Sequence, residues 1–249
     1  MTKKYAVLGS PIAHSKSPQI HNYLFEATGF DASYERFEVS DLADFLIRHP
    51  DFDGLSLTMP LKEQAFATAS TLEANAIATG GVNTLLRVSD GWCGFNTDVQ
   101  GIANAVGFVP TTVGIIGSGA TAKSALQAFP KSTKRIFARN QALAKELAEK
   151  FDAEVVSFEK AISAEVVVST VTEGVLPDLL AGAQVGGTLL DCVYTNPELP
   201  AGKYLSGLTM LVHQAVIQQR IFQFGDPNHS LKNEPELVDG VLGLLGMAK

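Results

Sequence analysis

A lysine and an aspartate stand just beyond two apolar stretches of the chain. Lys62 follows the segment Leu57–Leu61, in which Pro60 interrupts an apolar run, and Asp98 follows the stretch Trp92–Thr97. A lysine ammonium stabilises negative charge that develops on an oxygen, and a carboxylate hydrogen-bonds the same group or keeps the lysine charged and oriented. We therefore interpret Lys62 and Asp98 as a candidate catalytic pair. The simpler alternatives are a solvated lysine and an aspartate that caps a helix.

Further polar residues stand where a packed core would not require them. Ser15 and Ser17 precede Pro18 at a predicted helix start, where hydroxyls and unpaired backbone N–H groups form a cradle for an anion. Capping by Ser17 alone would explain one of these serines but not both. Thr58 and Asn83 stand at the borders of apolar runs, which suits side chains presented to a small polar ligand in a cleft.

A glycine-rich loop in the middle of the chain matches a dinucleotide-binding fingerprint. Residues 117–122 read Gly-Ser-Gly-Ala-Thr-Ala, between the apolar run Thr112–Ile116 and a helical pattern. Gly117 allows a tight turn, Gly119 lets the backbone approach a pyrophosphate, and Ala122 keeps helix and strand close together. The helix N-terminus presents unpaired N–H groups and the positive end of its dipole to the phosphates. The loop residues assigned to a nicotinamide cofactor are Gly117, Ser118, Gly119, Ala120 and Thr121.

The residues after the next predicted strand favour one nicotinamide cofactor over the other. A site for NAD usually carries an acid there, about 20 residues past the glycines. The chain instead reads Ala138, Arg139 and Asn140, with no acid. A guanidinium binds a 2′-phosphate as a planar fork and stacks on adenine, whereas a carboxylate would repel the phosphate. We therefore predict NADP, bound in part by Ala138, Arg139 and Asn140, with a merely solvated Arg139 as the alternative.

The elements that position these residues follow from the hydrophobic pattern. Short apolar runs predict strands at residues 5–8, 54–58, 83–88, 92–95, 112–116, 135–138, 155–156, 166–169 and 189–191. Helical patterns cover residues 120–129 and 142–150, the stretch from about 211 onward, and a helix with Ser17 as N-cap that ends near Gly29. Strand–helix alternation in the second half predicts an α/β fold whose parallel sheet carries helices on both faces.

Composition excludes several classes of protein. The chain has 249 residues, of which 46% are hydrophobic and 18% charged, which suits one large or two modest globular domains. Its net charge of −7 argues against a nucleic-acid partner, because phosphate binding needs clustered positive charge. Cys93 and Cys192 have no metal-ligand spacing, so we predict neither a metal site nor a disulfide. Since no apolar run resembles a signal peptide or a membrane span, we expect a cytoplasmic protein with no membrane partner.

Motifs along almost the whole chain resemble, in order, those of the shikimate dehydrogenase family. They are Gly9–Pro18, Leu57–Lys62, Val82–Thr84, Asn96–Asp98, Gly117–Ala122, Asp191–Pro197 and Met210–Ala215. An ordered set is far less frequent by chance than any single motif. The resemblance implies an α/β, two-domain fold: an α/β substrate domain and a Rossmann-type dinucleotide-binding domain, with a cleft between them.

The resemblance also implies an activity and a set of site residues. The activity is the NADPH-dependent, reversible reduction of 3-dehydroshikimate to shikimate in aromatic amino acid biosynthesis. Lys62 and Asp98 would be the catalytic pair, and Ser15 and Ser17 would hold the substrate carboxylate. The other residues that would contact the substrate are Thr58, Asn83, Tyr194 and Gln214. We expect only this small-molecule partner, in a monomer or homodimer.

Domain boundaries follow from the same resemblance. Residues 1–98 would form the substrate-binding catalytic domain, joined by C-terminal helices in 208–249, and residues 99–207 would form the NADP-binding domain. The chain departs from the family pattern around Arg139, where Ala138 and Asn140 replace the usual Asn and Thr. Ser118 and Thr121 also stand where smaller residues or glycine are common.

Alternative functions stay open at this point. One is a quinate- or aminoshikimate-active member of the family, and another is a non-catalytic, nucleotide-binding paralogue. Retention of both Lys62 and Asp98 argues against the paralogue, because a protein that only binds needs no such pair. A folate-type dehydrogenase is disfavoured because the Ser15 and Ser17 cradle does not suit its substrate. His21, close to these serines, is interpreted as structural or as acting through a neighbour.

Overall fold

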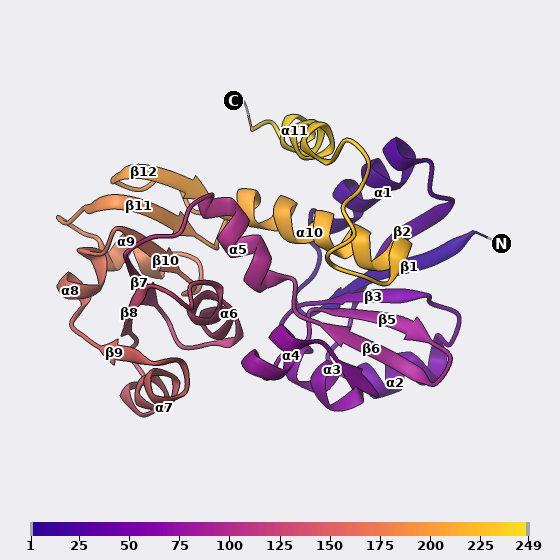
Figure 1. Ribbon diagram of the computed structural model, residues 1–249, viewed down its shortest axis with the longest axis horizontal. Coiled ribbons are helices and arrows are strands. Elements are labelled where there is room, and N and C mark those ends of the chain that lie inside the picture. The colour runs from indigo at the N-terminus through magenta and orange to yellow at the C-terminus, as the bar shows by residue number, and fades with distance from the viewer. Residues whose placement is uncertain (1, 248–249) are drawn as a thin grey trace. The chain divides into compact units, whose positions relative to one another are not determined.

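The computed structural model describes residues 2–247, which fall into two compact units (Figure 1). Unit 1 comprises the residues up to Thr97 together with those from Val212 onward, and unit 2 comprises Asp98–Leu211. Across the described residues, each unit contains one six-stranded sheet with helices packed on it. The predicted α/β class is therefore confirmed.

The sheet of unit 1 is mixed. Its strands, in spatial order, are β2 (Ala32–Glu38), β1 (Lys3–Gly9), β3 (Gly54–Leu57), β5 (Thr84–Val88), β6 (Gly91–Phe95) and β4 (Thr71–Leu72). β1 pairs in parallel with β2 and β3, whereas β5 runs antiparallel to β3 and β6. The hairpin of β5 and β6 turns at Ser89–Asp90, within the gap between the predicted strands 83–88 and 92–95. Because β1 and β3 are parallel neighbours, the loops after them leave the sheet at one edge.

The two faces of this sheet carry different helices (Figure 1). The helices are α1 (Ser17–Thr28), α2 (Leu42–Arg48), α3 (Lys62–Thr68), α4 (Ala74–Thr79), α10 (Gly207–Phe224) and α11 (Glu234–Leu244). Ala6 and Leu8 of β1 share an apolar core with α2, α3 and α4. The alternate residues Tyr5 and Val7 pack with α1 and with Phe222 of α10. Buried glutamines of α10 make this second face partly polar.

The sheet of unit 2 is parallel throughout. Its strands, in spatial order, are β12 (Ala201–Ser206), β11 (Val185–Asp191), β10 (Val166–Ser169), β7 (Thr112–Ile116), β8 (Thr133–Phe137) and β9 (Ala153–Val155). The chain winds outward from β7 to β9, returns to β10 beside β7, and winds the other way to β12. This is the strand order of a Rossmann-type dinucleotide-binding fold. Its switch point, where ligands bind at the carboxyl edge, lies between β7 and β10.

Helices cover both faces of this parallel sheet, as predicted. They are α5 (Asp98–Val106), α6 (Ala120–Ala128), α7 (Gln141–Phe151), α8 (Phe158–Ile162) and α9 (Val175–Leu179). One core contains apolar residues of α5, α6 and α7, and the other contains those of α8 and α9. α8 lies very close to β7, because a Cβ atom at Gly114 would be 2.1 Å from the carbonyl oxygen of Ala161. Of the helices in the described part of the chain, none has the length and apolar character needed to cross a bilayer.

The start of α1 differs from its prediction. Lys16 is the N-cap and makes no side-chain capping bond, while Ser17 is the first helical residue. The hydroxyl of Ser15 instead accepts a hydrogen bond from the backbone N–H of Ser17 at 3.3 Å. The prediction that Ser17 caps the helix is therefore wrong, because the chain enters the helical conformation one residue earlier. The C-terminal helix likewise begins before the predicted residue, at Gly207.

Candidate functional site

The glycine-rich loop joins β7 to α6 at the switch point of unit 2. Gly117 has a φ of +119°, and a Cβ atom there would lie 2.4 Å from the hydroxyl oxygen of Thr170. Both the backbone conformation and this close approach require glycine. At Gly119 a Cβ atom would meet no described atom within 4 Å, and this N-cap residue makes no side-chain capping bond. The space beside Gly119 at the N-terminus of α6 is therefore open, and a helix N-terminus suits an anion.

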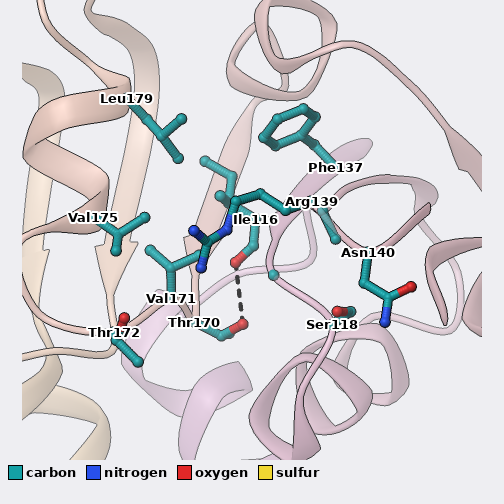
Figure 2. A pocket seen from close by; sticks show the side chains of 12 residues that line it. Ile116, Ser118, Phe137, Arg139, Asn140, Thr170, Val171, Thr172, Val175 and Leu179 are labelled. Atoms are coloured by element: carbon teal, nitrogen blue, oxygen red, sulfur yellow. Dashed lines mark hydrogen bonds between the residues drawn. The ribbon is translucent and has the colours of Figure 1, made fainter. Parts of the chain in front are cut away.

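A cavity of about 270 Å³ opens beside this loop (Figure 2). Its walls are the carboxyl ends of β7, β8 and β10 together with α9, which is where a Rossmann-type fold binds its nucleotide. The predicted cofactor residues in its lining are Gly117, Ser118, Ala138, Arg139 and Asn140. Gly119, Ala120 and Thr121 are not part of this lining and form the N-cap and first turn of α6.

Arg139 is the cationic residue of this lining. The residue is exposed, and Figure 2 shows its side chain extending across the cavity toward Val171. Its neighbours contribute in other ways. Ala138 is buried and belongs to the apolar core of unit 2. The side-chain oxygen of Asn140 accepts from the N–H of Leu143 at 3.1 Å and so caps α7.

A hydrogen-bonded bridge behind the cavity was not predicted from the sequence. The carboxylate of Asp191 accepts from the N–H of Val193 at 3.2 Å and from Asn196 Nδ2 at 2.8 Å. Asn196 Oδ1 accepts in turn from the N–H of Gly174, just before α9, at 3.1 Å. Burial raises the pKa of the Asp191 carboxyl group, although these hydrogen bonds oppose the shift. These hydrogen bonds connect the loop that contains Tyr194 to the segment just before α9. In the sequence, only the motif Asp191–Pro197 pointed to this region.

Two of the predicted substrate segments lie side by side in unit 1. The N–H of Ser10 donates to the carbonyl of Met59, and the N–H of Thr58 donates to the carbonyl of Leu8, both at 2.9 Å. A Cβ atom at Gly9 would lie 2.3 Å from Thr58 Cγ2, so glycine lets the end of β1 close onto Thr58. The structure thus brings Thr58 next to the loop that continues to Ser15 and Ser17.

The residues of the proposed catalytic pair each begin a helix. Lys62 is the first residue of α3 in unit 1 and is half-buried. Its carbonyl oxygen accepts from the N–H of Val82 at 3.0 Å, which ties the start of α3 to the segment before Asn83. Asp98 is the first residue of α5 in unit 2, and it is buried.

Asn83 and Gln214, predicted separately from two motifs, share a hydrogen-bonded neighbour in unit 1. Asn83 Oδ1 accepts from the N–H of Thr97 at 2.9 Å, while Asn83 Nδ2 donates to the Thr97 hydroxyl at 2.9 Å. Gln214 Oε1 lies 3.1 Å from the same hydroxyl. Thr97 itself was not assigned a role from the sequence. The sixth predicted substrate residue, Tyr194, belongs to unit 2, where burial raises the pKa of its hydroxyl.

Among the described residues, no three His, Cys, Asp or Glu side chains are grouped so that they could hold a metal ion. The polar groups that the described candidate residues offer are hydroxyls, amides, the Lys62 ammonium and the Asp98 carboxyl group. Such groups bind and polarise a small oxygen-rich molecule, and the Rossmann-type cavity takes a dinucleotide.

Two protein families match the chain, one in each unit. Residues 7–85 match the family described as shikimate dehydrogenase substrate binding domain. Residues 112–194 match the family described as NADP oxidoreductase coenzyme F420-dependent. The first match lies in unit 1 and the second in unit 2.

Individual relatives extend the similarity over most of the chain. A shikimate dehydrogenase (NADP(+)) of Anaeromyxobacter dehalogenans is 34% identical over 250 residues, covering 87% of this chain and 89% of that protein. A pentafunctional AROM polypeptide of Candida tropicalis is 37% identical over 153 residues, and the chain spans only 10% of that polypeptide.

Solved structures agree with these relatives. The crystal structure of Mycobacterium tuberculosis shikimate dehydrogenase is 33% identical, with a TM-score of 0.84 over 97% of this chain and 99% of that one. Shikimate 5-dehydrogenase from Thermus thermophilus, in complex with NADP(H) and shikimate, is 28% identical, with a TM-score of 0.80 over 95% and 97%. From these similarities across both units, the chain belongs to the shikimate dehydrogenase family.

Proposed function

We propose that this chain catalyses the NADPH-dependent, reversible reduction of 3-dehydroshikimate to shikimate. The observation that carries the proposal is the similarity, over 87% of the chain, to a protein named for this activity. In this proposal unit 1 binds the ring acid and unit 2 binds NADP. The match of residues 7–85 to a shikimate dehydrogenase substrate binding domain supports this division, and the Thermus thermophilus enzyme, solved with NADP(H) and shikimate, supports the pairing of these two ligands.

The cavity of unit 2 fits NADP in both charge and shape. Its lining includes Arg139 and no carboxylate, so a 2′-phosphate there would meet a guanidinium without a repelling acid. Val171 and Leu179 contribute apolar wall, which suits an adenine ring. The open N-terminus of α6 above Gly119 suits the pyrophosphate. When bound, the nicotinamide supplies or accepts the hydride, and the protein supplies position and electrostatic field.

The polar residues of unit 1 would hold the ring acid. The hydroxyls of Ser15 and Ser17, beside the start of α1, suit the carboxylate. Thr58, Asn83 and Gln214 suit the ring hydroxyls, because a hydroxyl donates and accepts in the same way as their side chains. From unit 2, we assign Tyr194 to the same task.

Lys62 and Asp98 would carry out the proton and charge chemistry. Negative charge develops on the carbonyl oxygen as the ring carbon is reduced, and a fixed ammonium lowers the energy of that transition state. Lys62 donates the hydrogen bond, and the proton, that this oxygen gains. Asp98 keeps Lys62 charged and oriented or hydrogen-bonds the same oxygen.

A direct assay tests this function. The absorbance of NADPH and of NADH is followed with 3-dehydroshikimate, and the reverse reaction is followed with shikimate and with quinate. We expect NADPH oxidation with 3-dehydroshikimate, and NADP⁺ reduction faster with shikimate than with quinate. Faster turnover of quinate would reassign the substrate. Thermal stabilisation by NADPH without turnover of any ring acid would indicate a non-catalytic paralogue.

A further inference from the structure

Helix α9 forms one wall of the nucleotide cavity but is too short to hold its own position. Its five residues include Pro177, which has no N–H to donate, and a helix of this length is unstable alone. Leu176 is fully buried in the core beneath it, whereas Val175 and Leu179 line the cavity. Figure 2 shows these two side chains on the side of α9 that faces Arg139. The shape of this wall therefore depends on contacts that α9 makes with its surroundings.

The hydrogen-bonded bridge from Asp191 to Asn196 supplies such a contact at the start of α9. Gly174, the N-cap residue of α9, has no side chain to cap the helix, and its N–H donates to Asn196 Oδ1 at 3.1 Å. Asn196 Nδ2 donates in turn to Asp191 Oδ2 at 2.8 Å. Asp191 is the last residue of β11 and is fully buried. The bridge thus connects the start of α9 to a fixed position in the sheet.

The donor and acceptor atoms of the bridge can be assigned, because a backbone N–H only donates. The N–H of Gly174 requires an oxygen of Asn196, so Asn196 Nδ2 is the atom that faces Asp191. The N–H of Val193 requires an acceptor at the other oxygen of Asp191, at 3.2 Å. Asp191 therefore accepts at both oxygens, as a carboxylate can and a side-chain amide cannot.

The position of Asp191 in the sheet relates the bridge to the cavity. Asp191 and Ser169 are partners in register at the carboxyl ends of β11 and β10. The chain continues from β10 into Thr170 and Val171, which line the cavity. Asp191 and Asn196 are not among the lining residues themselves. The bridge thus begins one strand away from the cavity and ends on the helix that forms its wall.

We propose that Asp191 and Asn196 are positioning residues for the cofactor, because their bridge holds α9 where Val175 and Leu179 can contact the nucleotide. The inference rests on the proposed function, since it takes NADPH as the occupant of the cavity. Both residues act through Gly174, and neither touches the cofactor. Without the bridge, the wall must be ordered when NADPH binds, and that ordering lowers the affinity.

Single substitutions break the bridge with almost no change in shape. In Asp191→Asn, an NH₂ group faces either Asn196 Nδ2 or the N–H of Val193, so two donors oppose each other. In Asn196→Asp, two carboxylates oppose each other. We expect either variant to raise the Kd for NADPH about 10-fold, measured by nicotinamide fluorescence without a ring acid. A wild-type Kd in both variants would overturn the proposal.

The double variant Asp191→Asn/Asn196→Asp provides the rescue. The amide at position 191 accepts from the N–H of Val193 and donates to the carboxylate at position 196, which still accepts from the N–H of Gly174. Only the middle hydrogen bond is reversed, and every donor again faces an acceptor. We expect the Kd for NADPH to return to within about threefold of wild type. A double variant that binds NADPH as weakly as the single variants would contradict the role of the bridge.

Amide hydrogen exchange locates the effect within unit 2. We expect the peptide that contains α9 to exchange about 10-fold faster in both single variants and at the wild-type rate in the double variant. Exchange in α7, whose apolar residues belong to the other core of this unit, should not change. Wild-type exchange of α9 in the single variants would show that the bridge does not hold this helix, and the proposal would fail.

A control separates positioning from folding. Thr112→Val removes the hydroxyl that accepts from the N–H of Glu165 at 3.0 Å, at the amino end of β7 and away from the cavity. We expect a lower melting temperature with an unchanged Kd for NADPH. An equal rise of this Kd in Thr112→Val would show that the Kd follows stability alone. If Asp191→Asn and Asn196→Asp lower only the melting temperature, their role is merely structural. Either result overturns the proposal.

Two further outcomes complete the test. Should the single variants not fold, Asn196→Ala removes the bridge without opposing two donors or two charges, and its Kd for NADPH decides the outcome. A wild-type protein that does not bind NADPH would overturn the proposed function and this inference together. Wild-type protein that binds NADPH and turns over the ring acid, with unaffected variants, would overturn the inference alone.

Discussion

A Cβ atom at Gly117 would lie 2.4 Å from the hydroxyl oxygen of Thr170, and that hydroxyl donates at 3.1 Å to the carbonyl oxygen of Ile116. The contact joins the ends of β7 and β10 at the switch point of unit 2. The floor of the nucleotide cavity is therefore shaped by the missing side chain of Gly117.

Alanine at the two loop glycines should separate folding from cofactor binding. Gly117→Ala adds a clash with Thr170 at a φ of +119°, so we expect a lower melting temperature and NADPH affinity reduced about 10-fold or more. Gly119→Ala meets no described atom within 4 Å, so its melting temperature should equal that of wild type. Its Cβ projects where the pyrophosphate would approach, so its NADPH affinity should still fall. Nicotinamide fluorescence titration and thermal melts measure both quantities.

Gly186→Ala is the matched control for this pair. A Cβ atom there also meets no described atom within 4 Å, in a strand distant in sequence from the glycine loop. Neither its melting temperature nor its NADPH affinity should change. Wild-type NADPH affinity in Gly119→Ala would contradict the assignment of the pyrophosphate to this loop.

Arg139→Ala should discriminate between the two nicotinamide cofactors. Loss of a charge-assisted contact to the 2′-phosphate should raise KM for NADPH about 10- to 100-fold and leave KM for NADH nearly unchanged. Steady-state rates with each cofactor provide the measurement. Arg135→Ala serves as control, because the Arg135 guanidinium donates to the carbonyl of Lys160 and the hydroxyl of Ser163. Equal losses with NADH and NADPH in Arg139→Ala would remove Arg139 from 2′-phosphate recognition.

Lys62→Ala should impair chemistry and spare cofactor binding. Removal of the ammonium that stabilises the developing oxyanion should lower kcat about 100-fold or more. The Kd for NADPH should stay near the wild-type value, because Lys62 is not among the residues that line the nucleotide cavity. Lys131→Ala, an exposed lysine of unit 2, controls for loss of a positive charge. A near-normal kcat in Lys62→Ala would exclude this lysine from the mechanism.

His21 should make stability depend on pH. Burial lowers its pKa from 6.5 to about 3 in the folded protein, so only the unfolded chain takes up the proton as pH falls below 6.5. The stabilising contribution is complete above pH 6.5 and is lost as pH falls toward the folded pKa. From about pH 7 to about pH 5 this linkage lowers the free energy of unfolding by about 2 kcal/mol.

Urea unfolding across this range, compared with His21→Gln, isolates the histidine from the carboxylates that titrate in both proteins. The difference between the two unfolding free energies should change by about 2 kcal/mol with pH. Parallel curves for the two proteins would show that His21 titrates normally in the folded state.

The sequence predicted the core of unit 2 well, because its central strands are continuous apolar runs. The strands Thr112–Ile116 and Val166–Ser169 match their predicted bounds. The glycine loop after the first of them located the nucleotide cavity, since its spacing is a local property of the chain. Arg139 was found in the same way, from its place after the next strand.

The edge strands β2 and β12 and the short helix α9 were not predicted. β2 and β12 lie at sheet edges, where solvent accepts polar side chains on both faces and the alternation of apolar residues is weak. α9 has only five residues, too few to show a helical period.

The hydrogen bonds within unit 1 also could not be predicted from the sequence. Asn83 and Gln214 came from separate motifs, and the contact between them spans 131 residues. The link from Thr97 to Gln214 spans 117 residues. Such pairs depend on how α10 packs on the sheet. The signal in the sequence was the set of glutamines spaced along a largely apolar helix, and their role could be interpreted only once their partners were known.

Unit 1 is built from two separated stretches of the chain, whereas unit 2 is one continuous stretch. During synthesis, residues of the N-terminal sheet emerge long before their partners on α10. Tyr5 packs against Phe222, and Ser56 and Thr84 form hydrogen bonds with Gln218. Domains made first usually fold first on the ribosome. Here the segment that forms unit 2 is synthesised in full before unit 1 is complete, and the face of the N-terminal sheet that carries α1 stays only partly covered until α10 emerges.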